Sequence, residues 1–184
     1  MQITRTQLAA ALPFAHKEKT RYAMNAVRVF STGNACTVEA TNGKQLIRVT
    51  DASLDSDARD ADSLTVPAEL AKQSLRGFPR GKRSQHIEVS RVGEVISTES
   101  SGQSLTYRET LGVFPPTDDV WPESPEGLVI GLGVPVLEVL IKALKAAKLD
   151  VVKLTIKDAE AGVHFVSSGG DVKLEGILMP VQIA

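Results

Sequence analysis

Few side chains in this sequence are of a type and spacing that could form a catalytic or metal centre. Cys36 is the single cysteine, and the three histidines, His16, His86 and His164, lack the paired spacing of metal ligands. No Gly-x-Ser-x-Gly turn is present, and no Cys–His pairing offers an activated nucleophile. We therefore expect no metal site, no catalytic residues and no enzyme activity.

Two segments have part of the pattern of a ligand-binding loop. Residues 131–133 read Gly-Leu-Gly, as in a dinucleotide-binding loop, but Val136 stands where that fingerprint needs its third glycine. An acidic segment alternates like a calcium loop, although Arg59 and Val66 occupy ligand positions and the central glycine is absent. Its aspartates are Asp55, Asp57, Asp60 and Asp62. We expect a solvated loop here, and neither a bound cation nor a bound cofactor in this chain.

Basic side chains form two groups that could contact a polyanion such as DNA. Lys142, Lys145 and Lys148 share one face of an expected helix. The second group lies on or just after another expected helix and consists of Lys72, Arg76, Arg80, Lys82 and Arg83. Such groups bind phosphates without reading base sequence, and the other interpretation is a solvated helix face. The net charge of −1 excludes a protein that coats DNA through bulk charge, but not a local basic face.

The C-terminal segment, residues 174–184, is apolar and contains Met179 and Pro180 directly after a strand-like run. Chain ends that are not tied down are usually polar and disordered, so we expect this end to be packed. Methionine is adaptable and commonly lines binding surfaces that accept several partners. The segment is therefore a candidate for one wall of a groove.

Three helices are expected in the chain. The first covers residues 4–12, with Thr4 or Thr6 as its N-cap. The second and third begin near Pro67 and Pro135, each within a Val-Pro pair. Proline is accepted in the first turn of a helix because its missing N–H would have no partner within the helix there.

Strands are expected after each helix, because apolar and polar residues alternate there. In the third helix, Leu137, Ile141 and Leu144 form the apolar face, and Gly77 is a plausible end of the second. The expected strands cover residues 22–30, 35–41 and 44–50, then 86–90, 94–98 and 104–110, then 152–157, 163–165 and 172–177. We expect residues 152–157 to form a half-buried strand.

One helix followed by three or four antiparallel strands is thus a repeat, which recurs at a spacing of roughly 60 to 70 residues. Boundaries between repeats are expected at residues 51–63 and 115–127, which are rich in aspartate and proline respectively. We expect an α+β protein with one complete two-repeat domain over residues 1–124 and an additional half-domain over residues 125–184. No apolar run reaches the length of a membrane span and no signal peptide is recognisable, so a cytoplasmic protein without a membrane partner is expected.

Three short motifs occur in the same order as in a known family. They read Ala-Thr-Asn-Gly-Lys-Gln-Leu over residues 40–46, Phe-Pro-Pro-Thr-Asp-Asp-Val-Trp-Pro over 114–122 and Leu-Met-Pro-Val-Gln-Ile over 178–183. They resemble the Ala-Thr-Asp-Gly-His-Arg-Leu, Phe-Pro-Asp…Pro and Met-Pro-Met-Arg-Leu segments of the bacterial DNA sliding clamp, the beta subunit of DNA polymerase III. Together with the repeats, the resemblance covers nearly the whole chain.

The resemblance implies the DNA-clamp fold and a cleft that binds peptides. Helices line the pore of a clamp and contact DNA, which gives the basic residues above that role. The family's usual His-Arg is Lys44-Gln45 here, so affinity for standard clamp-binding peptides is expected to differ. Carried over by position, the cleft is lined on one side by Met24, Thr41, Gly43, Lys44, Gln45 and Leu46, at its edge by Pro122, and on the other side by Met179, Pro180 and Val181.

The chain also differs from a full clamp, which has six repeats in three domains. This chain has three, and the regions that close the ring in the family have no counterpart, so the usual dimeric ring is not expected. Four chains would supply the twelve repeats of a full ring. Alternatively, the third repeat could pair with its copy in a second chain.

The expected function is that of a non-catalytic, homo-oligomeric sliding-clamp-like processivity or docking factor. It would bind short clamp-binding-motif peptides of polymerase-type or repair-type proteins, and it would contact or encircle duplex DNA. The alternative is a peptide-binding module derived from the clamp fold, without a ring and without a DNA role. A third interpretation is an assembly protein that uses the fold for self-association alone. Oligomeric state separates the first two interpretations.

Overall fold

The computed structural model describes residues 1–18, 20, 23–32, 35–55, 63–79, 86–108, 112–120, 127–169 and 172–181. The chain divides into two compact units, unit 1 (Met1–Asp119) and unit 2 (Val120–Ala184), and each is described by itself. Among the described residues, no helix is long and apolar enough to cross a membrane.

Unit 1 contains two repeats. A short 3₁₀ turn, η1 (Leu12–Phe14), follows its first helix, and a second, η3 (Asp118–Val120), spans the residues where unit 1 ends and unit 2 begins in the sequence. The first repeat comprises β1 (Gln2–Thr4), α1 (Arg5–Ala11), β2 (Ala26–Thr32), β3 (Ala35–Thr41) and β4 (Leu46–Asp55). The second comprises β5 (Ser63–Pro67), α2 (Ala68–Gly77), β6 (His86–Val92), β7 (Val95–Ser100) and β8 (Gln103–Arg108).

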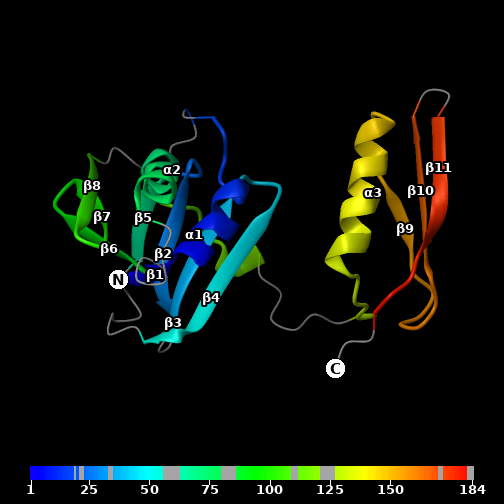
Figure 1. The fold of residues 1–184 in the computed structure, drawn as a ribbon, viewed down its shortest axis with the longest axis horizontal. Helices are drawn as coiled ribbons and strands as arrows, with labels where there is room; N and C mark the ends of the chain where they lie inside the picture. Colours follow the sequence, from blue (N-terminus) through cyan, green and yellow to red (C-terminus); the bar gives the residue numbers. More distant parts are fainter. Residues whose placement is uncertain are drawn as a thin grey trace. The chain divides into compact units, whose positions relative to one another are not determined.

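Each repeat of unit 1 gives the strand before its helix to the sheet of the other repeat (Figure 1). The two four-stranded sheets have the orders β4-β3-β2-β5 and β1-β6-β7-β8, with all pairs antiparallel. Thr4 pairs with His86 at the start of β6, and Pro67 pairs with Ala26 at the start of β2. The exchange is therefore reciprocal, and it joins the two repeats into one domain.

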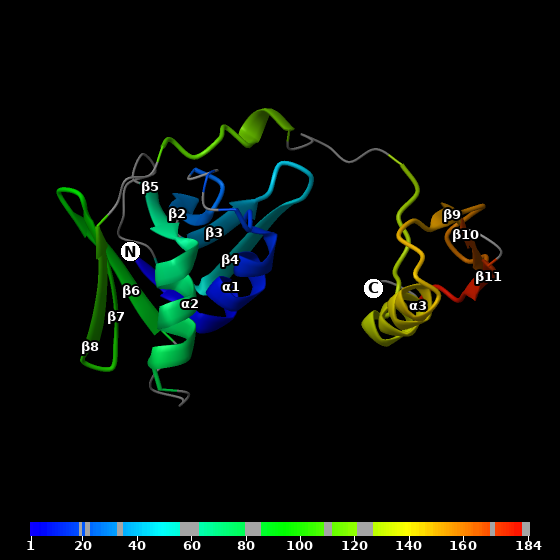
Figure 2. The same cartoon turned by 90° about the horizontal axis from the view of Figure 1, so that it is seen from above.

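The helices α1 and α2 lie side by side against the two sheets (Figure 2). Thr4 caps α1 as expected: its hydroxyl accepts from Gln7 N–H (3.1 Å), and Gln7 Oε1 accepts from Thr4 N–H (2.8 Å). The Gln7 amide also donates to the carbonyls of Cys36 (2.7 Å) and Val49 (3.1 Å). This buried side chain thus fixes the helix to β3 and β4 as well as capping it.

A buried carboxylate holds the end of unit 1 against the first sheet. Glu39 of β3 is fully buried and forms ion pairs with Arg28 and Arg48. Thr117 Oγ1 donates to Glu39 Oε1 (2.7 Å), and Arg48 reaches Asp118 as well. Burial alone would lower the pKa of Arg48, but its hydrogen bonds and its charge interactions with Glu39 and Asp118 outweigh burial and raise that pKa. The guanidinium therefore stays charged and connects the 112–119 segment to the sheet.

The described part of unit 2 contains one repeat, with one helix and one three-stranded antiparallel sheet. Leu140 and Leu144 of the helix pack on Leu149, Val163 and Leu178 to form its small core. The helix is α3 (Val134–Ala146), and the strands are β9 (Lys153–Thr155), β10 (Val163–Gly169) and β11 (Val172–Leu178). The strands lie in the order β11-β10-β9 in the sheet.

The α+β class and the repeat of a helix followed by antiparallel strands are confirmed. Pro135 lies in the first turn of α3 as expected, but the same expectation for Pro67 is wrong, because Pro67 is the N-cap residue that precedes α2. The repeats therefore align by their N-caps, Thr4, Pro67 and Gly133.

Several expected details differ in the structure. Ile141 is 48% exposed, and Leu140 takes the core position instead. All three residues of β9 are exposed rather than half-buried. β4 extends to Asp55, into the boundary expected at residues 51–63, and β5 begins at the last residue of that boundary. β5 was not expected as a strand, because its pairing with the distant β2 leaves no local sequence pattern. Gly77 is the last residue of α2, and Phe78 follows it in an extended conformation instead of a left-handed glycine cap.

Candidate functional site

The turn between β3 and β4 carries most of the residues expected on the first side of the cleft. Asn42 Oδ1 accepts from the N–H groups of Lys44 and Gln45, both at 3.0 Å. Thr41 Oγ1 donates to the Gln45 carbonyl (2.8 Å) and accepts from Gly43 N–H (3.1 Å). Gly43 has a φ of +83°, a left-handed conformation in which glycine has no steric cost. The turn is thus held by its own side chains and leaves Lys44 and Gln45 exposed.

Met24 lies against this turn. A Cβ atom added to Gly43 would lie 3.8 Å from the sulfur of Met24, which is ordinary van der Waals contact. Met24 and Leu46 are half-buried, and Thr41 is buried. The structure therefore brings together the expected residues of unit 1, with Lys44 and Gln45 as the polar tip and Met24 as the apolar base.

The chain end in unit 2 is tied down through its backbone. Val181 N–H donates to the Gly131 carbonyl (2.9 Å). This bond is part of an isolated β-bridge between Val181 and the segment before α3. Leu178 is buried, whereas Met179 is 64% exposed and Val181 is 51% exposed. The end is packed through Leu178, and the two following apolar side chains remain accessible for binding.

An apolar groove of about 490 Å³ lies between α3 and the strands of unit 2. It is lined by Pro135, Val136, Val139, Leu140, Ala143, Phe165, Ile177 and Leu178. Leu178 directly precedes Met179, so the groove adjoins the expected binding wall. A Cβ at position 176 would come 2.7 Å from the Phe165 ring, so glycine there leaves room for this ring at the groove. We refer to these eight lining residues as the unit 2 groove.

Sequence reasoning did not identify the unit 2 groove. A signal for it was present, because α3 has more apolar residues than one core-facing stripe requires, including Val134, Val139 and Ile141. Val139 and Ile177 are 67% and 66% exposed, and neighbouring exposed apolar side chains commonly mark a binding surface.

The two sides expected for the cleft lie in different units, Met24 and 41–46 in unit 1 and Met179–Val181 in unit 2. The expected edge residue Pro122 lies outside the described residues. A cleft between the units therefore stays a prediction, while the turn and the groove are each defined within one unit.

Basic residues on two of the helices are exposed. Lys72 and Arg76 lie one turn apart on α2, and Lys142 and Lys145 lie on α3. Lys148 follows α3 in a left-handed conformation with φ +56°. The exposed side of α1 has only Thr6, Ala9 and Ala10. Arg80, Lys82 and Arg83 fall outside the described residues.

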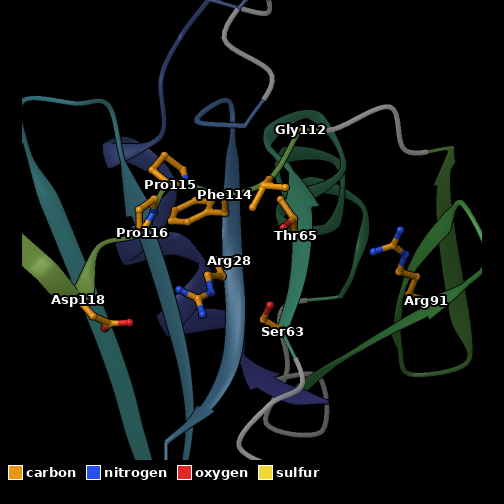
Figure 3. A pocket seen from close by; sticks show the side chains of 10 residues that line it. Arg28, Ser63, Thr65, Arg91, Gly112, Phe114, Pro115, Pro116 and Asp118 are labelled. Carbon is orange, nitrogen blue, oxygen red and sulfur yellow. The ribbon is translucent and has the colours of Figure 1, made fainter.

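A second, polar hollow of about 680 Å³ lies in unit 1, over β2 and β5 (Figure 3). Phe114, Pro115 and Pro116 cover one side of it, and the two arginines at its walls are both engaged. Arg28 pairs with Glu39 and lies over the Phe30 ring at 4.6 Å, and Arg91 donates to the Gly93 carbonyl (2.9 Å). The 112–118 segment is itself held to the sheet by Thr117, which donates to Glu39, and by Asp118, which pairs with Arg48. Both arginines at the walls and the covering segment are thus engaged within unit 1, so we assign the hollow a structural role.

No protein-family model matches the sequence, and no curated protein matches it significantly. Solved structures do match. The DNA polymerase sliding clamp of Bacillus subtilis matches with a TM-score of 0.75 and 16% identity, over 99% of this chain and 49% of that chain. The beta subunit of the DNA polymerase of Streptococcus pyogenes matches with a TM-score of 0.79 and 17% identity, over 99% of this chain and 50% of that chain.

A third match, the DNA polymerase III subunit beta of Pseudomonas aeruginosa, has a TM-score of 0.77 and 14% identity, over 98% of this chain and 50% of that chain. This chain therefore spans about half the length of the solved chains that it matches. Similarity at this level of identity concerns the fold. Together with the reciprocal strand exchange of unit 1, it shows that the chain has the fold of the bacterial DNA sliding clamp.

Proposed function

We propose that this protein is a non-catalytic docking factor of the sliding-clamp type, which binds short peptide motifs of polymerase-type or repair-type proteins and contacts duplex DNA. The observation that carries the proposal is the unit 2 groove, an accessible apolar site next to Met179 on a chain with the clamp fold. A fold by itself hosts many functions, so the groove supplies the chemical argument.

The groove suits a short extended peptide with large apolar side chains. All eight lining residues are apolar, and a volume of about 490 Å³ accommodates one or two such side chains. Met179 adds an unbranched, polarizable side chain that adapts to different ligands. The peptide class that we propose is rich in Gln and Leu, with the leucines in the groove.

We further propose that Met24 and the turn 41–46 contact the same peptide. Asn42 holds the backbone at Lys44 and Gln45 while their side chains are exposed, so these side chains can bond to peptide carbonyls or side-chain amides without an ordering cost for the turn itself. Because Lys44 and Gln45 replace His and Arg of the clamp motif, we expect the preferred peptide to differ from standard clamp-binding motifs.

DNA contact rests on the helices. Lys72, Arg76, Lys142 and Lys145 present ammonium and guanidinium groups on exposed helix faces, where they can approach phosphates without base readout. The affinity would be low and sensitive to salt, since few charges take part and the net charge is −1.

Peptide docking is tested by fluorescence polarisation with a labelled Gln- and Leu-rich clamp-motif peptide. We expect saturable binding that Met179→Asp and Val139→Glu abolish, because each places a charge in an apolar contact. Val172→Glu is the matched control, since Val172 is also an exposed apolar residue of unit 2 but does not line the groove. Equal affinity of all three variants and the natural protein would contradict the proposal.

A second candidate is a peptide-binding module without a ring or a DNA role. The neutral exposed face of α1 and the net charge of −1 favour it. Retention on circular DNA that is lost after linearisation would support the ring, whereas peptide binding without any DNA retention would support the module.

A further inference from the structure

We propose that unit 2 pairs with unit 2 of a second copy of this chain, so that two single repeats form a complete two-repeat domain like unit 1. The interface would consist of the two α3 helices and of an exchange of the segments before α3. This inference goes beyond the proposed function and does not depend on peptide or DNA binding. In unit 1, each repeat is covered by a helix and a strand of the other repeat.

In unit 1 each helix is covered by the helix of the other repeat. We call this contact the helix seam. Arg5 of α1 donates to the carbonyl of Leu75 in α2 and to that of Phe78 (3.4 Å). α2 also contacts α1 and η1, and Ala68 and Leu75 of α2 line a shared hollow with Ala9, Leu12 and Pro13 of the first repeat. The first residue of one helix thus faces the eighth of the other.

The N-caps define equivalent positions in α3. Counted from the N-caps Thr4, Pro67 and Gly133, the first residues are Arg5, Ala68 and Val134, and the eighth are Leu12, Leu75 and Ile141, of which Leu12 directly follows the last residue of α1. The alignment is consistent in the core, since the seventh residues, Ala11, Ser74 and Leu140, are all buried. Val134 and Ile141 therefore occupy the seam positions of α3.

These seam positions are apolar but uncovered in unit 2. Ala68 is 2% exposed in the seam of unit 1, whereas its equivalent Val134 is 67% exposed and Ile141 is 48% exposed. Most of the exposed large apolar side chains of the described residues lie in unit 2, although it is the smaller unit. Covering Val134 and Ile141 with an apolar partner removes this surface from water and is favourable.

The sheet of unit 2 has the matching open edge. In unit 1 the first strand after each helix, β2 or β6, receives the strand that precedes the other helix. The equivalent strand in unit 2 is β9, which pairs with β10 on one side and with no described strand on the other. This open edge of β9, which carries the exposed side chain of Leu154, is a template for pairing with another strand.

The segment before α3 is the corresponding donor. It contains Leu128 and Val129, which are 51% and 68% exposed, and Gly131 uses one side of the segment for its bond to Val181. By analogy with β1 and β5, residues 128–132 would pair antiparallel with residues 151–155 of the partner.

A second copy of this chain would supply both missing elements, the helix that covers Val134 and Ile141 and the segment that pairs with the open edge of β9. Unit 2 contains the donor segment as well as the receiving edge. A two-fold axis therefore lets each copy donate its own segment to the partner's edge and accept the partner's segment at its own edge. The seam is also self-complementary, because Val134 of one copy would meet the partner's Ile141 and the reverse contact would follow from symmetry. A different protein would need to reproduce both features.

The first test is the molar mass of the full chain by light scattering coupled to size exclusion. We expect the mass to approach a multiple of two chains of 19.7 kDa each at high concentration. Ile141→Glu should shift the protein to 19.7 kDa, whereas Val139→Glu, at a more exposed position on the groove side of α3, should leave the mass unchanged. A monomer at every concentration, or an equal effect of the two variants, would overturn the proposal.

A second test does not depend on a destabilising charge. Val134→Cys and Ile141→Cys are made separately in a Cys36→Ala background, then mixed and oxidised. Only the mixture should form a disulfide-linked dimer, because identical positions would lie about 10 Å apart along the paired helices, which is beyond disulfide reach. A mixture of Val139→Cys with Ile141→Cys is the control. Crosslinking in the control, or none between positions 134 and 141, would overturn the proposal.

Discussion

At the scale of single residues, Glu39 shows how an ionised group can be buried without being isolated. Its carboxylate accepts from Thr117 and pairs with two arginines that remain partly exposed to water. A buried charge is tolerated when its hydrogen bonds are satisfied, and removing a partner leaves the others unpaired. The residue links the middle of the first sheet to the chain that leaves unit 1.

We predict that Glu39→Gln lowers the free energy of unfolding of the protein by about 1.5–3 kcal/mol, the range for hydrogen bonds to charged groups. The change removes the charge that pairs with Arg28 and Arg48 while it keeps the size of the side chain. Urea denaturation measures the effect. Glu99→Gln, at an exposed site on β7, should change stability little, and equal effects of both variants would contradict this role of Glu39.

Cys36 gives a prediction on pH dependence. Burial raises the pKa of its thiol, so the folded protein holds the proton at a pH where the unfolded chain has lost it. The unfolded state then binds fewer protons, and stability falls as pH rises above the ordinary thiol pKa of 9.0. Chemical denaturation between neutral and alkaline pH should show a smaller decline for Cys36→Ala. An identical decline in both proteins would contradict this contribution.

At the scale of elements, the sequence predicted best what local chemistry determines. The N-cap of α1 at Thr4, the strand β3 over residues 35–41 and the start of β6 at His86 agree with the structure. The strand exchange of β1 and β5 was not foreseen, because strand partners far apart in sequence leave no local pattern. The residues of the turn between β3 and β4 were found through a motif, but the groove of unit 2 was missed because its residues come from three separate elements.

The strand β11 supplies a prediction on the groove. Gly176→Val should lower affinity for a clamp-motif peptide, since a side chain at this position collides with the Phe165 ring and pushes it into the groove. Near-ultraviolet circular dichroism and thermal melting establish that the fold is retained, and fluorescence polarisation measures the affinity. Gly169→Val, which approaches Leu149 and not the groove, is the control for a general loss of stability. Undiminished affinity of Gly176→Val would show that Phe165 does not shape the binding site.

At the scale of the whole molecule, three repeats make one closed domain and one open half. In unit 1 the two helices contact each other, and β2 and β6 each receive the strand of the other repeat, whereas unit 2 leaves an apolar helix face and the equivalent edge of β9 exposed. The chain is about half as long as the solved clamps that it resembles. Pairing through unit 2 would give two chains six repeats, arranged as three closed domains.

The proposed DNA contact belongs to this scale because it would depend on the summed charge of exposed helices. Lys142→Gln/Lys145→Gln should weaken binding to duplex DNA and reduce the slope of log affinity against log salt by about 2, one unit for each phosphate that is no longer neutralised. Lys153→Gln/Lys157→Gln removes the same charge from exposed sites off the helix and is the matched control. Equal losses in both double variants would indicate non-specific attraction and not a helix-lined contact.

The central proposal, that a clamp-motif peptide binds at the unit 2 groove beside Met179 and also contacts Met24, has a direct test. The chain has three methionines, Met1, Met24 and Met179, so methyl-labelled methionine gives a three-signal NMR spectrum that Met→Leu variants assign. Titration with a clamp-motif peptide should shift the signals of Met24 and Met179 together and leave Met1 unchanged. A shift of Met179 alone would contradict a two-sided cleft, and the absence of any shift would contradict peptide docking.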